Sequence, residues 1–347
     1  MTASIKHLDE EKLCRYLEQN LAGFRGPLKA QKFSDGQSNP TFKIEAASGS
    51  YVLRRKPPGK LLKSAHAVDR EFRVLKALEK TDVPVATPYL LCQDDNVIGS
   101  WFYVMSYEEG RIFWDPVLPD LSREKRLAYY DEMNRVLAAI HGVDIQAVGL
   151  EDYGKPGNYF ARQTRRWSQQ YEASRTDRIE SMEFLMSWLP DHIPEDEGQC
   201  CLIHGDFRLD NMIFHPDRPE VIAVVDWELS TLGHPLADLS YQCMQWRLPQ
   251  SSPGIKGLGG VDRRAQGLPT EREYVRQYCE RRGIAHIENW SFYLAFNFFR
   301  LAAIIQGVYK RALEGNASSD QAKKLGSMTR IVADYALDVI EQGEEVL

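Results

Sequence analysis

Apolar and polar residues alternate along residues 28–53, and this alternation predicts β-strands. The pattern is interrupted at Gly36 and again at Ser48-Gly49-Ser50, which are typical of turns between strands. Before this stretch, from Leu8 to Leu21, the apolar residues follow helical spacing. We therefore expect a short amphipathic helix followed by strands that are joined by turns.

A second amphipathic helix is predicted over residues 67–80, because apolar residues recur there at helical spacing. These residues are Val68, Phe72, Leu75 and Leu78. Pro84 and Pro88 exclude a longer helix. The aromatic and β-branched run Trp101–Met105 then predicts a buried strand.

From Ser122 onward the pattern becomes mostly helical and predicts a mainly α region. The first helix there places five apolar residues on one face and stops at Gly142. The five are Leu127, Tyr130, Met133, Leu137 and Ile140. Residues 248–267 are rich in proline, serine and glycine and predict an irregular loop. We place a domain boundary after residue 106, between a smaller lobe (1–106) and a larger one (107–347).

Composition narrows the class of protein. The chain has 347 residues, 43% of them hydrophobic, which is enough for one large or two packed domains. A net charge of −6 disfavours a nucleic-acid binder, because binding to a phosphate backbone needs a basic face. Six cysteines without a regular framework indicate reduced thiols in a cytoplasmic protein.

No segment predicts a secretory signal or a membrane anchor. Met1–Asn20 mixes acidic and basic residues without an apolar core segment. Trp290–Tyr309 is the most apolar long stretch, but Asn297, Arg300 and Gln306 interrupt it. This spacing favours a buried helix over a lipid-spanning one, and we expect no membrane partner.

The central segment brings a carboxylate and two possible metal ligands into one short region. The apolar run Cys201–Ile203 leads into His204-Gly205-Asp206, and Asn211 precedes the apolar triplet Met212–Phe214. A turn-rich stretch around Arg218 separates this triplet from a second apolar run that ends at Asp226. A hairpin of the two runs would return Asp226 to the end where Asn211 lies.

These residue types suit phosphoryl transfer. Magnesium prefers a few hard oxygen ligands and takes the others from water and phosphates. One carboxylate to orient a hydroxyl and two ligands for a metal are sufficient, because catalysis of this reaction consists mostly of positioning and charge neutralisation.

The spacing His204-x-Asp206 with Asn211, followed by Asp226 after an apolar strand, resembles the aminoglycoside phosphotransferase and choline kinase family of the protein-kinase-like superfamily. The chain looks most like the branch fused to acyl-CoA dehydrogenases. Supporting blocks are Gly36–Phe42, Tyr51–Arg54, Arg70–Leu75, Tyr103–Met105 and Gly233–Leu239. The resemblance covers nearly the whole chain and implies a two-lobed α+β fold with a small mixed β-sheet lobe and a larger helical lobe.

The resemblance also implies residue roles, with ATP and Mg²⁺ as cofactors. Asp206 would be the catalytic base, supported by His204, and Asn211 and Asp226 would be the metal ligands. In the smaller, nucleotide-binding lobe, the resemblance assigns a phosphate loop, the helix partner of the phosphate-holding cation and the adenine hinge. These are Gly36, Ser38, Asn39 and Thr41 for the loop, Glu71 for the helix partner, and Met105 to Tyr107 for the hinge.

One position departs from the family. Where lysine is usual on the third strand, this chain has Arg54, which can hold phosphates but is not equivalent to lysine. Lys56 lies on the same face of the predicted strand and is the alternative cation. Residues 54–56 could instead form a solvated basic turn. No Asp-Phe-Gly motif or long activation segment follows Asp226, which disfavours a protein substrate.

Two further patterns have competing interpretations. Cys200, Cys201, His204 and His215 could suggest zinc, but no second cysteine pair stands at ligand spacing. The basic residues Arg162, Arg165 and Arg166 beside Trp167 could line an acceptor cleft or form a charged helix face.

We expect an enzyme that transfers the γ-phosphoryl group of ATP to a hydroxyl of a small molecule, with a hydroxylated acyl compound as one candidate acceptor. The alternative is a nucleotide-binding pseudokinase that senses or scaffolds. Retention of Asp206, Asn211 and Asp226 favours the enzyme, whereas Arg54 favours the pseudokinase.

Overall fold

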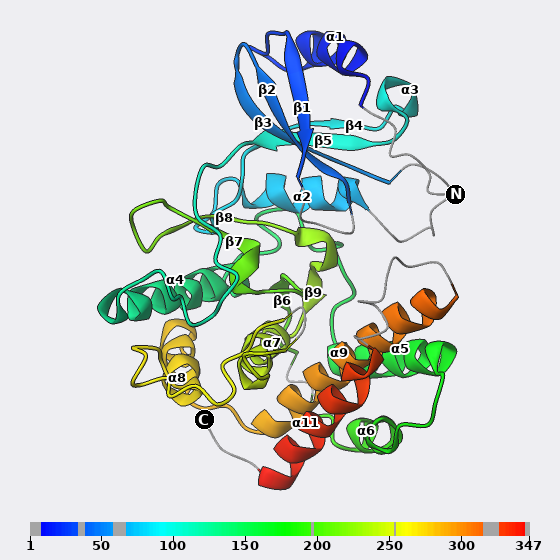
Figure 1. The fold of residues 1–347 in the computed structure, drawn as a ribbon, viewed down its shortest axis with the longest axis vertical. Helices are drawn as coiled ribbons and strands as arrows, with labels where there is room; N and C mark the ends of the chain where they lie inside the picture. Colours follow the sequence, from blue (N-terminus) through cyan, green and yellow to red (C-terminus); the bar gives the residue numbers. More distant parts are fainter. Residues whose placement is uncertain are drawn as a thin grey trace. The chain divides into compact units, whose positions relative to one another are not determined.

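The computed structural model describes residues 8–33, 39–57, 67–195, 198–252, 255–314 and 326–343. The predicted α+β class is confirmed, because an antiparallel sheet is followed along the chain by a mainly helical region (Figure 1). By their internal packing the residues form two compact units. The first comprises Met1–Ile112, Val148–Leu150 and Asn211–Ser230, and the second comprises Phe113–Ala147, Glu151–Asp210 and Thr231–Leu347. The boundary after residue 106 stays a prediction.

The first unit contains a five-stranded sheet in the order β1-β2-β3-β5-β4. The strands are β1 (Leu28–Lys32), β2 (Thr41–Ala46), β3 (Gly49–Arg55), β4 (Pro88–Cys92) and β5 (Phe102–Ser106). Every pairing is antiparallel, so the sheet is not mixed in strand direction. The predicted turn near Gly49 is confirmed between β2 and β3, whereas Gly36 lies outside the described residues.

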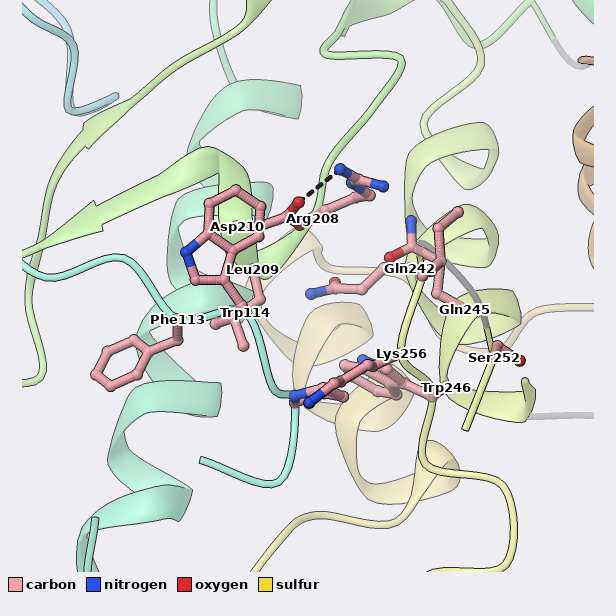
Figure 2. A pocket seen from close by; sticks show the side chains of 12 residues that line it. Phe113, Trp114, Arg208, Leu209, Asp210, Gln242, Gln245, Trp246, Ser252 and Lys256 are labelled. Atoms are coloured by element: carbon pink, nitrogen blue, oxygen red, sulfur yellow. Dashed lines mark hydrogen bonds and ion pairs between the residues drawn. The ribbon is translucent and has the colours of Figure 1, made fainter. Parts of the chain in front are cut away.

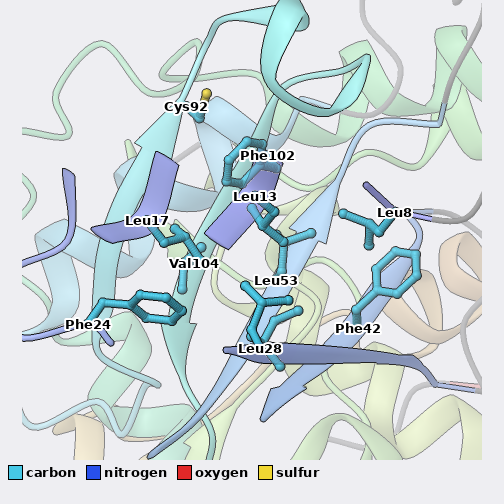
Figure 3. Close-up of a cluster of buried hydrophobic side chains, with 11 residues drawn as sticks. Leu8, Leu13, Leu17, Phe24, Leu28, Phe42, Leu53, Cys92, Phe102 and Val104 are labelled. Atoms are coloured by element: carbon cyan, nitrogen blue, oxygen red, sulfur yellow. The ribbon is translucent and has the colours of Figure 1, made fainter. Parts of the chain in front are cut away.

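Helices cover both faces of this sheet. On one face α1 (Glu10–Asn20) inserts Leu13 and Leu17 into an apolar cluster with Leu53 and Phe102 (Figure 3). Side chains alternate along a strand, so the neighbours Arg54 and Tyr103 point to the opposite face. Helix α2 (Val68–Leu78) packs against β4 and β5, and it brings Glu71 to Arg54 and Tyr103. A short helix, α3 (Asp95–Ile98), follows β4.

A hairpin, β7 (Met212–Phe214) with β8 (Val221–Val224), also belongs to the first unit. Its strands pair antiparallel, which confirms the predicted hairpin. The amide of Val225 donates to the carbonyl of Asn211 at 2.9 Å. This bond continues the pairing to the residue before Asp226.

The second unit is mainly helical. Its helices are α4 (Arg123–His141), α5 (Tyr159–Ser174), α6 (Glu180–Asp191), α7 (Leu236–Arg247), α8 (Glu271–Arg282), α9 (Trp290–Leu313) and α11 (Met328–Gln342). Helix α9 packs against α5, α7 and α11 and is the core of this unit. Strands β6 (Cys201–Ile203) and β9 (Thr231–Gly233) pair antiparallel. Residues 248–252 and 255–267 contain no helix or strand, as predicted for the loop.

The buried face of α4 differs from the predicted one at a single position, because Tyr130, Met133, Leu137 and Ile140 are buried as predicted. Leu127 is 50% exposed, and Arg126 occupies the buried side in its place. The Arg126 guanidinium donates to the carbonyls of Leu118 and Leu121 and to Gln266. A charged side chain tolerates burial when its donors are satisfied in this way. The spacing of apolar residues along the sequence does not reveal which charged side chain will find such partners.

Helix α9 matches the predicted buried helix. By length and composition it could cross a membrane, but 83% of its apolar window is buried within this chain. The three polar residues that interrupt it bond inward: Asn297 to the carbonyl of Ala237, Arg300 to that of Gly205, and Gln306 to that of Ser174. Packing inside the chain therefore accounts for the apolar character of α9.

Candidate functional site

The loop that follows β6 is held by one buried carboxylate, that of Asp238. The amides of His204 and Gly205 donate to Asp238 at 2.6 and 2.9 Å. The amide of Asp206 donates to Nδ1 of His204 at 3.2 Å. Gly205 has φ +83°, a conformation that glycine adopts at little cost. The backbone that carries Asp206 is thus fixed by three hydrogen bonds.

Asp238 remains ionised although it is only 1% exposed. Burial would raise the pKa of Asp238, but hydrogen bonds from His141 and the Gly205 amide, with charge from His204, bring it below its usual range. Sequence reasoning did not assign this residue a role. The sequence does contain one sign of such a role. Asp238 is a carboxylate between Ala237 and Leu239, in the first turn of an apolar helix.

We predict that Asp238→Asn lowers the free energy of unfolding by about 3 kcal/mol, because an amide cannot accept from both backbone donors and leaves one unsatisfied. Thermal unfolding followed by circular dichroism measures this. The control is Asp177→Asn, an exposed position, which should leave the melting temperature unchanged. Equal melting temperatures for both variants would contradict the role given to Asp238.

The carboxylate of Asp206 is oriented by Tyr241 of α7. The Tyr241 hydroxyl donates to Oδ1 of Asp206 at 2.7 Å, and Nε of Arg208 lies 3.7 Å from the same oxygen. Burial raises the pKa of Tyr241, and Asp206 raises it further, so the phenol keeps its proton. The Asp206 side chain is 20% exposed and thus accessible.

Arg300 of α9 supports this arrangement from the core. Its guanidinium donates to the Gly205 carbonyl at 2.5 Å and lies 5.0 Å from the ring centroid of Tyr241. Arg300 thus contacts the residue before Asp206 and the tyrosine that orients the Asp206 carboxylate. Neither Tyr241 nor Arg300 was assigned to the site from the sequence, because their partners lie 35 and 95 residues away along the chain.

In the first unit, Arg54 contacts three carboxylates. Its Nε lies 2.8 Å from Oε2 of Glu71, and Nη2 lies 2.5 Å from Oδ1 of Asp226 and 3.5 Å from Oε2 of Glu228. The arginine side chain is 13% exposed. Burial alone would lower the pKa of Arg54, but these carboxylates raise it, so the guanidinium stays charged.

Glu71 is the most buried member of this group. Asn39 and Tyr103 donate to its two oxygens at 2.8 and 3.0 Å. Burial raises the pKa of Glu71 to about 7, although Arg54 opposes the shift. Thr41 joins the group through a contact of 3.5 Å from Arg54. The structure therefore brings Asn39, Thr41, Arg54 and Glu71 together, whereas Gly36 and Ser38 lie outside the described residues.

The pKa of Glu71 predicts how stability depends on pH. The folded state holds a proton on Glu71 that the unfolded state loses near the ordinary glutamate pKa of 4.5, so stability falls as the pH rises from there to about 7. The loss is about 3 kcal/mol at most. Apparent melting temperatures between pH 5 and 8 test this, with Glu71→Gln as the comparison. The variant should show a flatter pH dependence, and parallel curves would contradict the prediction.

The neighbours of Arg54 on β3 have other partners. Lys56 lies 3.6 Å from Asp69 and 3.9 Å from the ring centroid of Trp101. Arg55 points to the opposite face, where it is 2% exposed and donates to the carbonyl of Ile98. Because Arg54 and Arg55 belong to β3, residues 54–56 are not a solvated turn. Arg54 is the cation that pairs with Glu71.

Asn211 and Asp226 lie at the same end of the hairpin. Asp226 has φ +66°, a left-handed conformation that aspartate tolerates better than most residues. An amide oxygen and a carboxylate at the same end of a hairpin are ligand types that fit magnesium, which takes its other ligands from water and phosphates. Arg54 already contacts one oxygen of Asp226, so a metal there would share that carboxylate with the guanidinium. Among the described residues, no three His, Cys, Asp or Glu side chains gather as a metal site.

The remaining sequence candidates occupy separate places. Met105 is buried in β5, and Tyr107 follows that strand with Lys43 4.6 Å above its ring. Arg162 donates to the carbonyls of Lys155 and Pro156. Arg165 and Arg166 are exposed on α5, which agrees with a charged helix face.

The second unit contains a cavity of about 280 Å³ beside the loop of Asp206 (Figure 2). Arg208, Leu209 and Asp210 form one wall, and Trp246 of α7 lies in another. The rest of the lining is Phe113, Trp114, Pro116, Gln242, Gln245, Ser252, Ile255 and Lys256. The Arg162, Arg165 and Arg166 side chains do not line this cavity.

Residues 29–276 match the profile of a family described as the phosphotransferase enzyme family, which includes most of the chain. The chain belongs to this family. A protein from Ralstonia eutropha, provisionally assigned as an aminoglycoside phosphotransferase, is 48% identical in sequence to this chain. Its crystal structure matches this one with a TM-score of 0.88. The match covers 97% of this chain and 99% of that one. A thermostable mutant of aminoglycoside phosphotransferase APH(4)-Ia shares the fold at 16% identity, with a TM-score of 0.63 over 96% of this chain and 99% of that one.

The chain is also similar to parts of longer, curated proteins. Mouse acyl-CoA dehydrogenase family member 10 is 51% identical over 90% of this chain, and the match covers 29% of that protein. The probable acyl-CoA dehydrogenase IBR3 of Arabidopsis thaliana is 44% identical over 99% of this chain and 44% of that protein. The chain thus spans less than half the length of these relatives, and the predicted resemblance to their kinase-like part is confirmed.

Proposed function

We propose that this family member transfers the γ-phosphoryl group of ATP to a hydroxyl of a small molecule, with Asp206 as the base. The observation that carries the proposal is the carboxylate of Asp206, which Tyr241 orients at 2.7 Å on a loop that Asp238 fixes. A base for phosphoryl transfer must be held within reach of the attacking hydroxyl. The new O–P bond forms as the bond to the leaving ADP oxygen breaks, and the hydroxyl proton passes to Asp206.

In this proposal the first unit binds the nucleotide. Arg54 would contact phosphate oxygens with donors of its planar fork while Glu71 keeps the guanidinium oriented. Asn211 and Asp226 would hold Mg²⁺, which supplies charge neutralisation at the phosphates when bound. Crystal structures of APH(4)-Ia with ADP or AMP-PNP support nucleotide binding by this fold.

The acceptor is proposed to be a hydroxyl compound of low mass. A structure of APH(4)-Ia in complex with hygromycin B supports a small-molecule acceptor. The longer relatives carry the name acyl-CoA dehydrogenase, and this favours a hydroxylated acyl compound as one candidate. We also propose a cytoplasmic location, in keeping with six free cysteines.

A nucleotide-binding pseudokinase is the second candidate, and one observation favours it. Arg54 contacts Oδ1 of Asp226 at 2.5 Å, so the carboxylate assigned to the metal is already paired with a cation. A chain in which this pair persisted would bind nucleotide without turnover.

The first test measures ADP release by the purified protein with ATP and Mg²⁺ across aminoglycosides, choline, sugars and hydroxyacyl compounds. We expect one acceptor class to stimulate release, and Asp206→Ala to reduce the stimulated rate by roughly 10²- to 10⁴-fold, the usual contribution of a general base. Nucleotide binding should persist in the variant. The control is Asp217→Ala, an exposed turn residue that should keep full activity.

Two results would each contradict a different part of this proposal. Tight ATP binding without stimulation by any hydroxyl acceptor would favour the pseudokinase. Stimulated turnover that survives Asp206→Ala would exclude Asp206 as the base while leaving a phosphotransferase.

A second prediction concerns Arg54→Lys. Lysine keeps the charge but loses the fork that contacts Glu71 and Asp226 together, so we expect the KM for ATP to rise about tenfold, equivalent to about 1.4 kcal/mol. Steady-state kinetics at saturating acceptor measures this, with Arg15→Lys on the exposed side of α1 as the control. An unchanged KM would indicate that another cation holds the phosphates.

A further inference from the structure

The charged side chains that line the cavity beside the Asp206 loop already have partners. Arg208 pairs with Asp210 at 2.5 Å (Figure 2). Lys256 pairs with Asp115 at 3.0 Å. Among the described lining residues Asp210 is the single acid, and Arg208 already neutralises it. A compound with several ammonium groups would therefore meet no carboxylate that is not already neutralised. Its charges would lose their hydration without gaining an opposite charge as a partner.

Neutral hydrogen-bond donors are the second feature of this cavity. Nε2 of Gln242, Nε2 of Gln245 and Oγ of Ser252 are buried without a hydrogen-bond partner among the described residues. The Tyr274 hydroxyl donates to Oε1 of Gln242 at 2.7 Å, which leaves the amide nitrogen as the end that lacks a partner. Buried donors without acceptors are uncommon in folded proteins. An oxygen of a ligand would satisfy them.

Aromatic surface is the third feature. Trp114 is 60% exposed although it lines the cavity, whereas Trp246 is 4% exposed and packs against Tyr130 and Tyr274. The buried indole is part of the core. The exposed indole of Trp114 offers an apolar ring face to a ligand. Covering this face would be favourable because it removes apolar surface from water.

We propose that this cavity binds the acceptor and selects a hydroxyl compound with a short apolar segment that ends in a carbonyl or carboxylate oxygen. The oxygen accepts from Gln242 and Gln245, and the apolar segment covers Trp114. The role as acceptor rests on the phosphotransferase function proposed above. A volume of about 280 Å³ is at the small end for ligand sites, so a segment rather than a whole large molecule enters it.

The test compares three ligands of equal length that differ at one end: ω-hydroxyhexanamide, ω-hydroxyhexanoate and aminohexanol, with hygromycin B as a polycation. Isothermal titration calorimetry on the full chain without nucleotide measures their affinities. We expect the amide and the carboxylate to bind at least about tenfold more tightly than the ammonium compound, because its ammonium end offers the two glutamines no acceptor. Binding is thus measured apart from turnover.

Two variants locate the binding. Trp114→Ala changes an exposed side chain and should weaken the amide and the carboxylate alike. Gln245→Glu keeps the shape but replaces a donor with a negative charge, so it should weaken the carboxylate more than the amide. Matched controls are Trp188→Ala, which removes an indole that stacks on His192, and Gln169→Glu on the exposed face of α5. Neither control residue lines the cavity, so both should bind as the parent protein does.

The outcomes separate this proposal from the phosphotransferase function. Binding of the amide or carboxylate that depends on Trp114 supports the proposal even if no ADP is released, in which case the proposed function fails by itself. Tighter binding of aminohexanol or hygromycin B, equal affinities in Trp114→Ala, or no binding of any probe at millimolar concentration would overturn it. Acceptor-stimulated turnover could still establish the enzyme in each of those cases.

Discussion

The first unit depends on one guanidinium that balances three acidic side chains. Arg54 lies within 3.5 Å of Glu71, Asp226 and Glu228, and its own side chain is largely buried. Charges out of water are stable only with close partners, and removal of one partner leaves the others uncompensated. An arginine meets this demand better than a lysine because its fork can contact separate carboxylates at the same time. The arginine at this position thus has a structural consequence within this chain.

The second unit uses the reverse arrangement, in which a buried anion is satisfied by surrounding donors. Asp238 accepts from two consecutive backbone amides and from His141, and this fixes the loop before Asp206. Tyr241 and Arg300 then act on the loop from α7 and α9. The packing of α9 is therefore connected to the carboxylate of Asp206, since α9 holds the carbonyl of the preceding residue.

The sequence predicted the elements well where periodicity was the controlling property. The hairpin that returns Asp226 towards Asn211 follows from two apolar runs around a turn, and the structure contains it. The face of α4 was predicted wrongly at Leu127, because the buried position belongs to an arginine whose partners include a loop residue 140 positions away along the chain. Tyr241 escaped sequence reasoning for the same reason. Local pattern encodes burial, whereas a hydrogen bond between residues far apart in the chain depends on the completed fold.

The first unit is assembled from chain segments that are far apart in the sequence. Asn211–Ser230 belongs to it, so the partner of Arg54 on the hairpin is synthesised more than a hundred residues after β3. A fragment that ends near residue 112 contains the sheet but leaves Arg54 and Glu71 without Asp226. Co-translational folding of the sheet would therefore precede the completion of its ionic network. An attempt to express the smaller unit alone would need the hairpin grafted back by a linker.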